Sequence, residues 1–167
     1  MQAPRQDPGG SVPEHPFTYS QFSVRGHQSA TGLDDEFIQM LDAFRMSGGI
    51  ARSHEIAALM RFEPGHGMEV LARWIAQRRV LHFEWAGEFW LPVFQFARPS
   101  MTARPELTIV LTELAPVMSS WQMAVWFSKP NVLLAREAPV SQMRTFPDKV
   151  YQAARSDRQR LSMSAGR

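Results

Sequence analysis

The sequence contains no cysteine, and this absence excludes several kinds of structure and chemistry. A chain without cysteine has no disulfide framework, no thiolate zinc ligand and no cysteine nucleophile, and it suits a reducing cytoplasm. A run of about 18 apolar residues is also missing, so no transmembrane helix is expected. The first residues have no apolar segment of the kind that a secretory signal needs. We therefore expect a cytoplasmic protein with no membrane contact.

Sequence motifs for catalysis and for cofactor binding are lacking as well. The five histidines form no HExxH motif and no other close metal-ligand spacing. The motifs GxGxxG, GxxxxGK[ST] and GxSxG do not occur. The three acids at 34–36 are better explained by the start of a helix, where the macrodipole favours them, than by acid–base catalysis. We therefore predict a protein that is not an enzyme and that holds no metal or cofactor.

Strong charge of either sign is also absent. The formal net charge is +2, and the excess of basic residues lies in residues 105–167, which contain five acids and eight bases. This weak asymmetry permits nucleic-acid binding but does not argue for it, because a strong electrostatic footprint would be larger.

The remaining composition predicts a folded protein with one unfolded end. A chain of 167 residues with 44% hydrophobic residues fits one domain or two small ones. Residues 1–32 are rich in Pro, Gly, Ser and Gln, and their few aromatic residues follow no helical or strand period. Such a segment buries too little surface to offset its ordering entropy, so we predict a flexible tail. The alternative is that 17–24 docks as a short arm.

Residues 33–96 are predicted to form a winged-helix-like unit. Apolar residues at helical spacing indicate one helix from about Leu33 to Gly48 and two more, over 55–60 and 68–77, with Ser53 as an N-cap. A β-hairpin is expected over 80–85 and 89–92, because aromatic residues crowd both sides of the turn at 86–88. Pro92 cannot donate a ladder hydrogen bond, which predicts a second arm that is short or at an edge.

The order of these elements is that of a winged helix-turn-helix. In that arrangement the helix over 68–77 would enter a DNA groove, and basic side chains beside it would contact DNA. The candidate DNA-binding residues are Arg61, His66, Arg73, Arg78 and Arg79. The alternative is a compact helical subdomain whose arginines are only solvated.

The C-terminal part is predicted to be a small helical bundle at 105–160, joined by a linker at 97–104. One helix over 105–115 places Leu107, Val110, Leu111 and Leu114 on one face. Further helices are expected at about 119–127 and 148–160, with a short apolar turn at 132–134. The stretch Phe94-Gln95-Phe96 should pack between the two units. The predicted fold class is therefore mostly α with one short hairpin.

The segment WQMAVWFSKPNVLL at 121–134 is the most unusual part of this bundle. All five tryptophans lie between residues 74 and 126, and aromatic residues in excess of what a core can bury mark partner surfaces. Aromatic residues at helical spacing also fit a core, so both interpretations stay open. Asn131 follows Pro130 and is predicted to cap the next turn with its side chain.

The run AVWFSKPNVLL, with APVSQM and FPDKVYQAAR after it, resembles the toxin-binding domain of antitoxins of the Xre, MbcA and ParS type. The matching residues are Trp126, Pro130, Asn131, Leu134, Pro139, Val150 and Ala154. Upstream, a stretch similar to one that follows the helix-turn-helix of relatives contains Gly87, Trp90, Pro92, Phe94, Gln95 and Phe96. Residues 135–139 differ, because family members have a Gly-Gly or Gly-x-Thr-Pro step there. The resemblance covers about residues 50–158.

This resemblance implies an antitoxin-like or transcription-regulator-like protein. Family members form homodimers, bind a cognate toxin through the C-terminal domain and often repress their own operon by binding operator DNA; NAD-consuming toxins of the RES type are among their partners. The candidate partner-binding residues are then Trp121, Trp126, Phe127, Pro130, Asn131 and Leu134. The long, Gly- and Pro-rich turn at 61–67 is unusual for DNA reading. It leaves open a second hypothesis, a protein-interaction adaptor or assembly factor that does not bind DNA.

Overall fold

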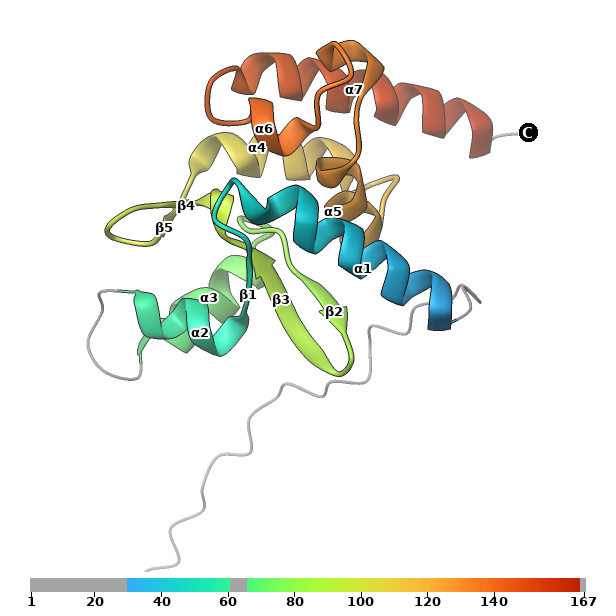
Figure 1. Ribbon diagram of the computed structural model, residues 1–167. Coiled ribbons are helices and arrows are strands. Elements are labelled where there is room, and N and C mark those ends of the chain that lie inside the picture. The colour runs from blue at the N-terminus through green and yellow to red at the C-terminus, as the bar shows by residue number, and fades with distance from the viewer. Residues whose placement is uncertain (1–29, 61–65, 166–167) are drawn as a thin grey trace, which may run out of the picture.

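The computed structural model describes residues 30–60 and 66–165, which are mostly helical with two small antiparallel sheets (Figure 1). The predicted fold class, mostly α with one short hairpin, is confirmed. Most of the predicted tail and Arg61 lie outside the described residues. Helix α1 spans Ala30–Arg45, so it includes the last three residues of the segment that we expected to be a tail.

The N-terminal elements have the connectivity of a winged helix. After α1 come β1 (Ile50–Arg52), α2 (Ser53–Leu59), α3 (His66–Ala76), β2 (Phe83–Trp85) and β3 (Glu88–Pro92). The sheet order is β1-β3-β2, and Ile50 faces Pro92 while Phe83 faces Trp90. The predicted hairpin is therefore present, with an added strand, β1, that the sequence did not indicate. Two helices, α2 and α3, cover one side of this sheet (Figure 1).

Two local expectations in this unit were wrong. Pro92 ends β3, which is the longest and central strand rather than a short or edge strand. The position tolerates proline because the next amide, that of Val93, makes the hydrogen bond to Gly49. Ser53 is the first residue of α2 and not its N-cap. Arg52 is the N-cap, and its N–H donates to the Glu55 carboxylate at 2.7 Å.

The approach of α3 to α2 depends on a glycine. Gly67 is buried at the second position of α3, and a Cβ there would overlap the backbone carbonyl oxygen of Ala57 in α2. The missing side chain of Gly67 therefore lets α2 and α3 pack closely.

The C-terminal elements are η2 (Val93–Gln95), β4 (Phe96–Ala97), β5 (Thr102–Ala103), α4 (Pro105–Leu114), α5 (Ser120–Ser128), η3 (Val132–Leu134), α6 (Pro139–Gln142) and α7 (Pro147–Ala165). Of these, the helices α4 to α7 form a layer above the three-stranded sheet in Figure 1. The four leucine and valine residues predicted to share one face of α4 are all buried. The expected linker at 97–104 contains a short two-stranded turn, because β4 and β5 pair.

The core consists of two clusters of buried side chains. One cluster joins Phe37, Met40 and Phe44 of α1 to buried residues of β2 and of α4 to α7. The other lies between α2, α3 and β3 and extends to β4 and β5. Phe94 packs against Phe44 and Phe127, whereas Phe96 packs against Trp74. The stretch 94–96 therefore lies between the clusters, as predicted.

Candidate partner-binding surface

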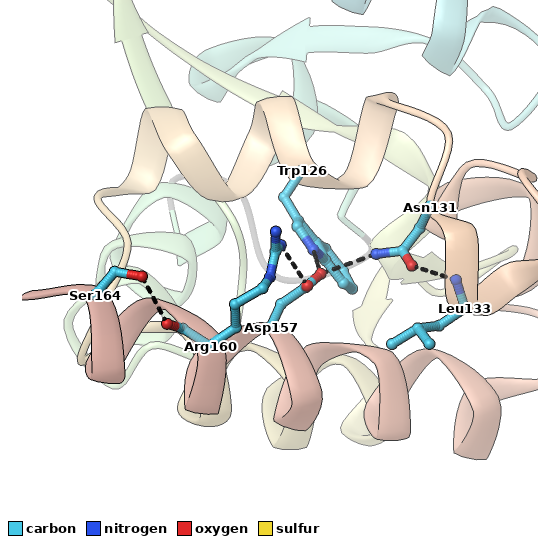
Figure 2. Close-up of polar contacts among 6 residues, drawn as sticks. All are labelled: Trp126, Asn131, Leu133, Asp157, Arg160 and Ser164. Atoms are coloured by element: carbon cyan, nitrogen blue, oxygen red, sulfur yellow. Dashed lines mark hydrogen bonds and ion pairs between the residues drawn. The ribbon is translucent and has the colours of Figure 1, made fainter.

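A buried carboxylate organises the C-terminal motif residues. Asp157 of α7 is only 7% exposed, and it is the one buried acidic side chain among the residues described. Its Oδ2 atom accepts hydrogen bonds from the Trp126 indole at 2.8 Å and from the Asn131 amide at 2.9 Å. Its Oδ1 atom pairs with Arg160 at 2.7 Å. Figure 2 shows these three side chains converging on Asp157 from α5, from the start of η3 and from α7 itself.

Asn131 also fixes the backbone that follows it. Its Oδ1 atom accepts the amide hydrogen of Leu133 at 2.9 Å, which confirms the predicted cap (Figure 2). Its backbone amide donates to Glu137, and its carbonyl accepts from the amides of Leu134 and Arg136. The segment from Asn131 to Glu137 is therefore a loop that is closed by backbone hydrogen bonds between Asn131 and the residues at 136–137.

This loop presents an apolar patch at the surface, which we call the 130–133 patch. The patch consists of Pro130, Val132 and Leu133; Val132 is 80% exposed and Leu133 is 55% exposed. Leu134 is buried and anchors the loop in the core. The patch is rigid for an exposed segment, because its backbone is tied to Asp157 through Asn131. Rigid, exposed apolar residues are the usual centre of a protein–protein contact.

The other predicted partner-binding residues lie deeper in the fold. Phe127 is fully buried in the core cluster that α1 shares with α4 to α7. Trp121 is half-buried, and its indole N–H donates to Glu36 of α1 at 2.8 Å. Trp126 is also half-buried and packs edge-on against Phe127. Of the predicted set, Pro130 is exposed, whereas the tryptophans act mainly as links between helices.

Hydrogen-bonded tryptophans explain why the chain has so many of them. The indoles of Trp85, Trp121 and Trp126 donate to the carboxylates of Asp34, Glu36 and Asp157, respectively. The indole of Trp90 donates to the carbonyl of Trp85. We expected the acids at 34–36 to lie at the start of a helix, and this was wrong, because α1 begins at Ala30. Two of them bind indoles from β2 and α5.

The predicted DNA-binding residues are exposed but do not form a strongly basic surface. Arg73, Arg78 and Arg79 are exposed on α3 and just after it, and the Arg79 guanidinium stacks over Trp74 at 5.6 Å. His66 begins α3 and is also exposed. From β1 to β3, the described residues include four arginines, which are these three and Arg52, and four acids, which are Glu55, Glu69, Glu84 and Glu88. Two of the acids lie on the hairpin, where a phosphate would be repelled.

Comparison with protein-family models, with curated proteins and with solved structures finds no significant match to this chain. In the described part of the chain, none of the helices is long and apolar enough to cross a membrane.

Sequence reasoning missed Asp157, although a signal for it exists. The apolar stripe of α7 contains Val150, Ala153 and Ala154, all of which are buried. Asp157 continues this stripe at i+3 and i+4 spacing, so a helical projection places a carboxylate on the buried face. A buried carboxylate needs hydrogen-bond donors, and Trp126 and Asn131 of the upstream motif supply them to Asp157.

Proposed function

We propose that this protein is an antitoxin-like or regulator-like adaptor that binds a partner protein through the 130–133 patch. The observation that carries the proposal is the pair of hydrogen bonds from Trp126 and Asn131 to Asp157. Because of them, two strongly exposed apolar side chains sit on a fixed backbone, and little conformational entropy is lost when a partner binds. The resemblance of this segment to a toxin-binding domain supports the same surface, with a toxin as the partner.

The charges near the patch indicate what the partner offers. Arg136 and Glu137, in the loop that carries the patch, are both exposed, and the exposed Arg160 is paired with Asp157. A partner with an apolar residue at the centre and polar groups of both signs around it would complement this arrangement. Binding would be dominated by the apolar centre, and it would therefore depend weakly on salt.

A binding experiment with a matched surface control tests this proposal. The protein is co-expressed with the product of the gene adjacent to its own, and complex formation is measured for wild type, for a Val132→Ser/Leu133→Ser variant and for Ile109→Ser. Ile109 is a similarly exposed apolar residue on α4, 58% exposed, and its variant serves as the control. We expect the double variant to bind at least about tenfold more weakly, because central apolar contacts dominate binding energy. Unchanged binding by the double variant would refute the proposal.

DNA binding through α3 is the second candidate function. The connectivity of a winged helix favours it, because α3 follows α2 and shares a core cluster with Leu91 of the β2–β3 hairpin. Homodimerisation would then place two copies of α3 on one operator. The test is the affinity for the DNA upstream of the gene at rising salt, in wild type and in Arg73→Ala. Specific binding that weakens steeply with salt and with the substitution would support it.

A further inference from the structure

A cleft away from the 130–133 patch is lined by arginines that pair with no acid among the residues that the structure describes. It has a volume of about 640 Å³ and lies where four segments meet: the end of α1, the stretch from η2 to β4, the start of α4, and α6 with the turn after it. In Figure 1 these segments lie close together on the side of β4. The volume is in the range of sites for small organic ligands.

Three arginines line this cleft, Arg98, Arg104 and Arg144, against one acidic residue, Glu106. Within the described residues, none of the three arginine side chains has an ion pair or a side-chain hydrogen bond. Arg45, Arg158 and Arg160 are the arginines in the described part of the chain that do form ion pairs. With three basic residues and one acidic residue in its lining, the cleft concentrates positive charge that no described carboxylate pairs with.

We propose that this cleft binds a phosphorylated small molecule, with Arg98, Arg104 and Arg144 holding its phosphate groups. A guanidinium presents a planar fork of N–H donors that matches phosphate oxygens, and several of them around one space favour a ligand with more than one negative charge. Ser141 and Thr145, which also line the cleft, supply hydroxyl groups of the kind that bond phosphate oxygens.

The rest of the lining fits an apolar or aromatic group on the same ligand. Met46, Phe94 and Val140 contribute apolar surface to the cleft. A nucleotide combines a phosphate chain with a flat base, and it is therefore the most suitable probe. A DNA duplex is far too wide to enter a space enclosed by four segments of the chain, so the site differs from the groove-binding surface expected of α3.

The cleft lies between two parts of the fold, so a ligand bound in it is expected to affect the stability of the protein. Arg144 follows α6 in the helical layer, whereas Arg98 lies in the turn after β4, at the edge of the cluster between α2, α3 and β3. A phosphate group held by both would link the two parts of the fold. Ligand binding is therefore expected to stabilise the whole chain against unfolding.

The test uses the full chain with inorganic pyrophosphate and ADP as probes and adenosine as the uncharged comparison. Affinity is measured by calorimetry, and the melting temperature is measured in parallel, for wild type, Arg98→Gln, Arg144→Gln and the control Arg155→Gln. Arg98, Arg144 and Arg155 are all exposed, so each variant should fold, and Arg155 lies on α7 outside the cleft lining. Amide shifts of Gly48 and Ser141, which line the cleft, report the location of binding.

We expect pyrophosphate and ADP to bind wild type and Arg155→Gln alike, with ADP the tighter, and to raise their melting temperatures. The dissociation constant should rise at least about tenfold in Arg98→Gln and in Arg144→Gln, because each loses a charged hydrogen-bond donor. Adenosine should bind much more weakly than ADP. Absence of pyrophosphate and ADP binding to wild type would overturn the proposal, as would binding that Arg98→Gln and Arg144→Gln leave unchanged. Because the cleft and the 130–133 patch have no residue in common, either proposal can fail without the other.

Discussion

Gln95 and Leu81 are joined by two hydrogen bonds that run in opposite directions. The Leu81 amide donates to Gln95 Oε1 at 2.7 Å, and Gln95 Nε2 donates to the Leu81 carbonyl at 2.9 Å. The Gln95 side chain is fully buried, so it takes the place of a neighbouring strand for the backbone at Leu81. It does so between the two core clusters, where Phe94 and Phe96 diverge.

Replacing this amide by an apolar side chain should destabilise the fold. In Gln95→Met the backbone N–H and C=O of Leu81 would remain buried without partners, at about 1–3 kcal/mol for each group. We expect the free energy of unfolding, from urea titration, to fall by about 2–6 kcal/mol. Gln152→Met on the exposed face of α7 is the control and should change stability by less than about 0.5 kcal/mol. A change in Gln95→Met no larger than in this control would contradict the prediction.

Asn131 should tolerate neither alanine nor aspartate. Asn131→Ala loses the cap, worth about 1 kcal/mol, and also the charged hydrogen bond to Asp157, worth about 1.5–3 kcal/mol. Asn131→Asp keeps the cap acceptor but sets a second carboxylate against Asp157. Both variants should therefore unfold at lower urea concentration than wild type. If Asn131→Asp were as stable as wild type, the contribution of Asn131 to stability would come from the cap alone and not from its hydrogen bond to Asp157.

The same substitution at two glycines should have opposite effects. Gly67→Ala places a methyl group against the backbone carbonyl of Ala57, which cannot move aside as easily as a side chain. We therefore expect the free energy of unfolding to fall by about 1–3 kcal/mol. Gly32 lies in α1 with open space around it, and Gly32→Ala should be neutral or stabilise by up to about 1 kcal/mol. Thermal unfolding measures both. Equal effects would show that the contact between α2 and α3 relaxes without cost.

His82 should make stability depend on pH. Burial lowers the pKa of His82 in the folded protein, whereas the unfolded chain keeps a value of about 6.5. As the pH falls through 6.5, the unfolded chain takes up the proton first, so the contribution is complete above that pH and is lost below it. Urea titrations at about pH 7.5 and 5.5 should show a smaller loss in His82→Gln than in wild type. An identical loss in the two proteins would contradict the prediction.

Features that depend on local pattern were predictable from sequence, and features that depend on distant pairing were not. The buried face of α4 follows from Leu107 and its neighbours at helical spacing, and the cap at Asn131 follows from residue type and position. Strand β1 has three residues, too few for a period, and it exists because β3 pairs with it. In the candidate surface, the motif predicted Trp126 and Asn131, but the carboxylate that joins them lies 31 and 26 residues away.

The place of α1 in the core has a consequence for synthesis of the chain. Phe37, Met40 and Phe44 precede the helix that packs against α1, because α5 begins only at Ser120. The elements from β1 to β3 can pair while translation continues, because their contacts are local. The β2–β3 hairpin supplies aromatic partners for Phe37 early, but α1 can complete its packing only when α5 has emerged from the ribosome.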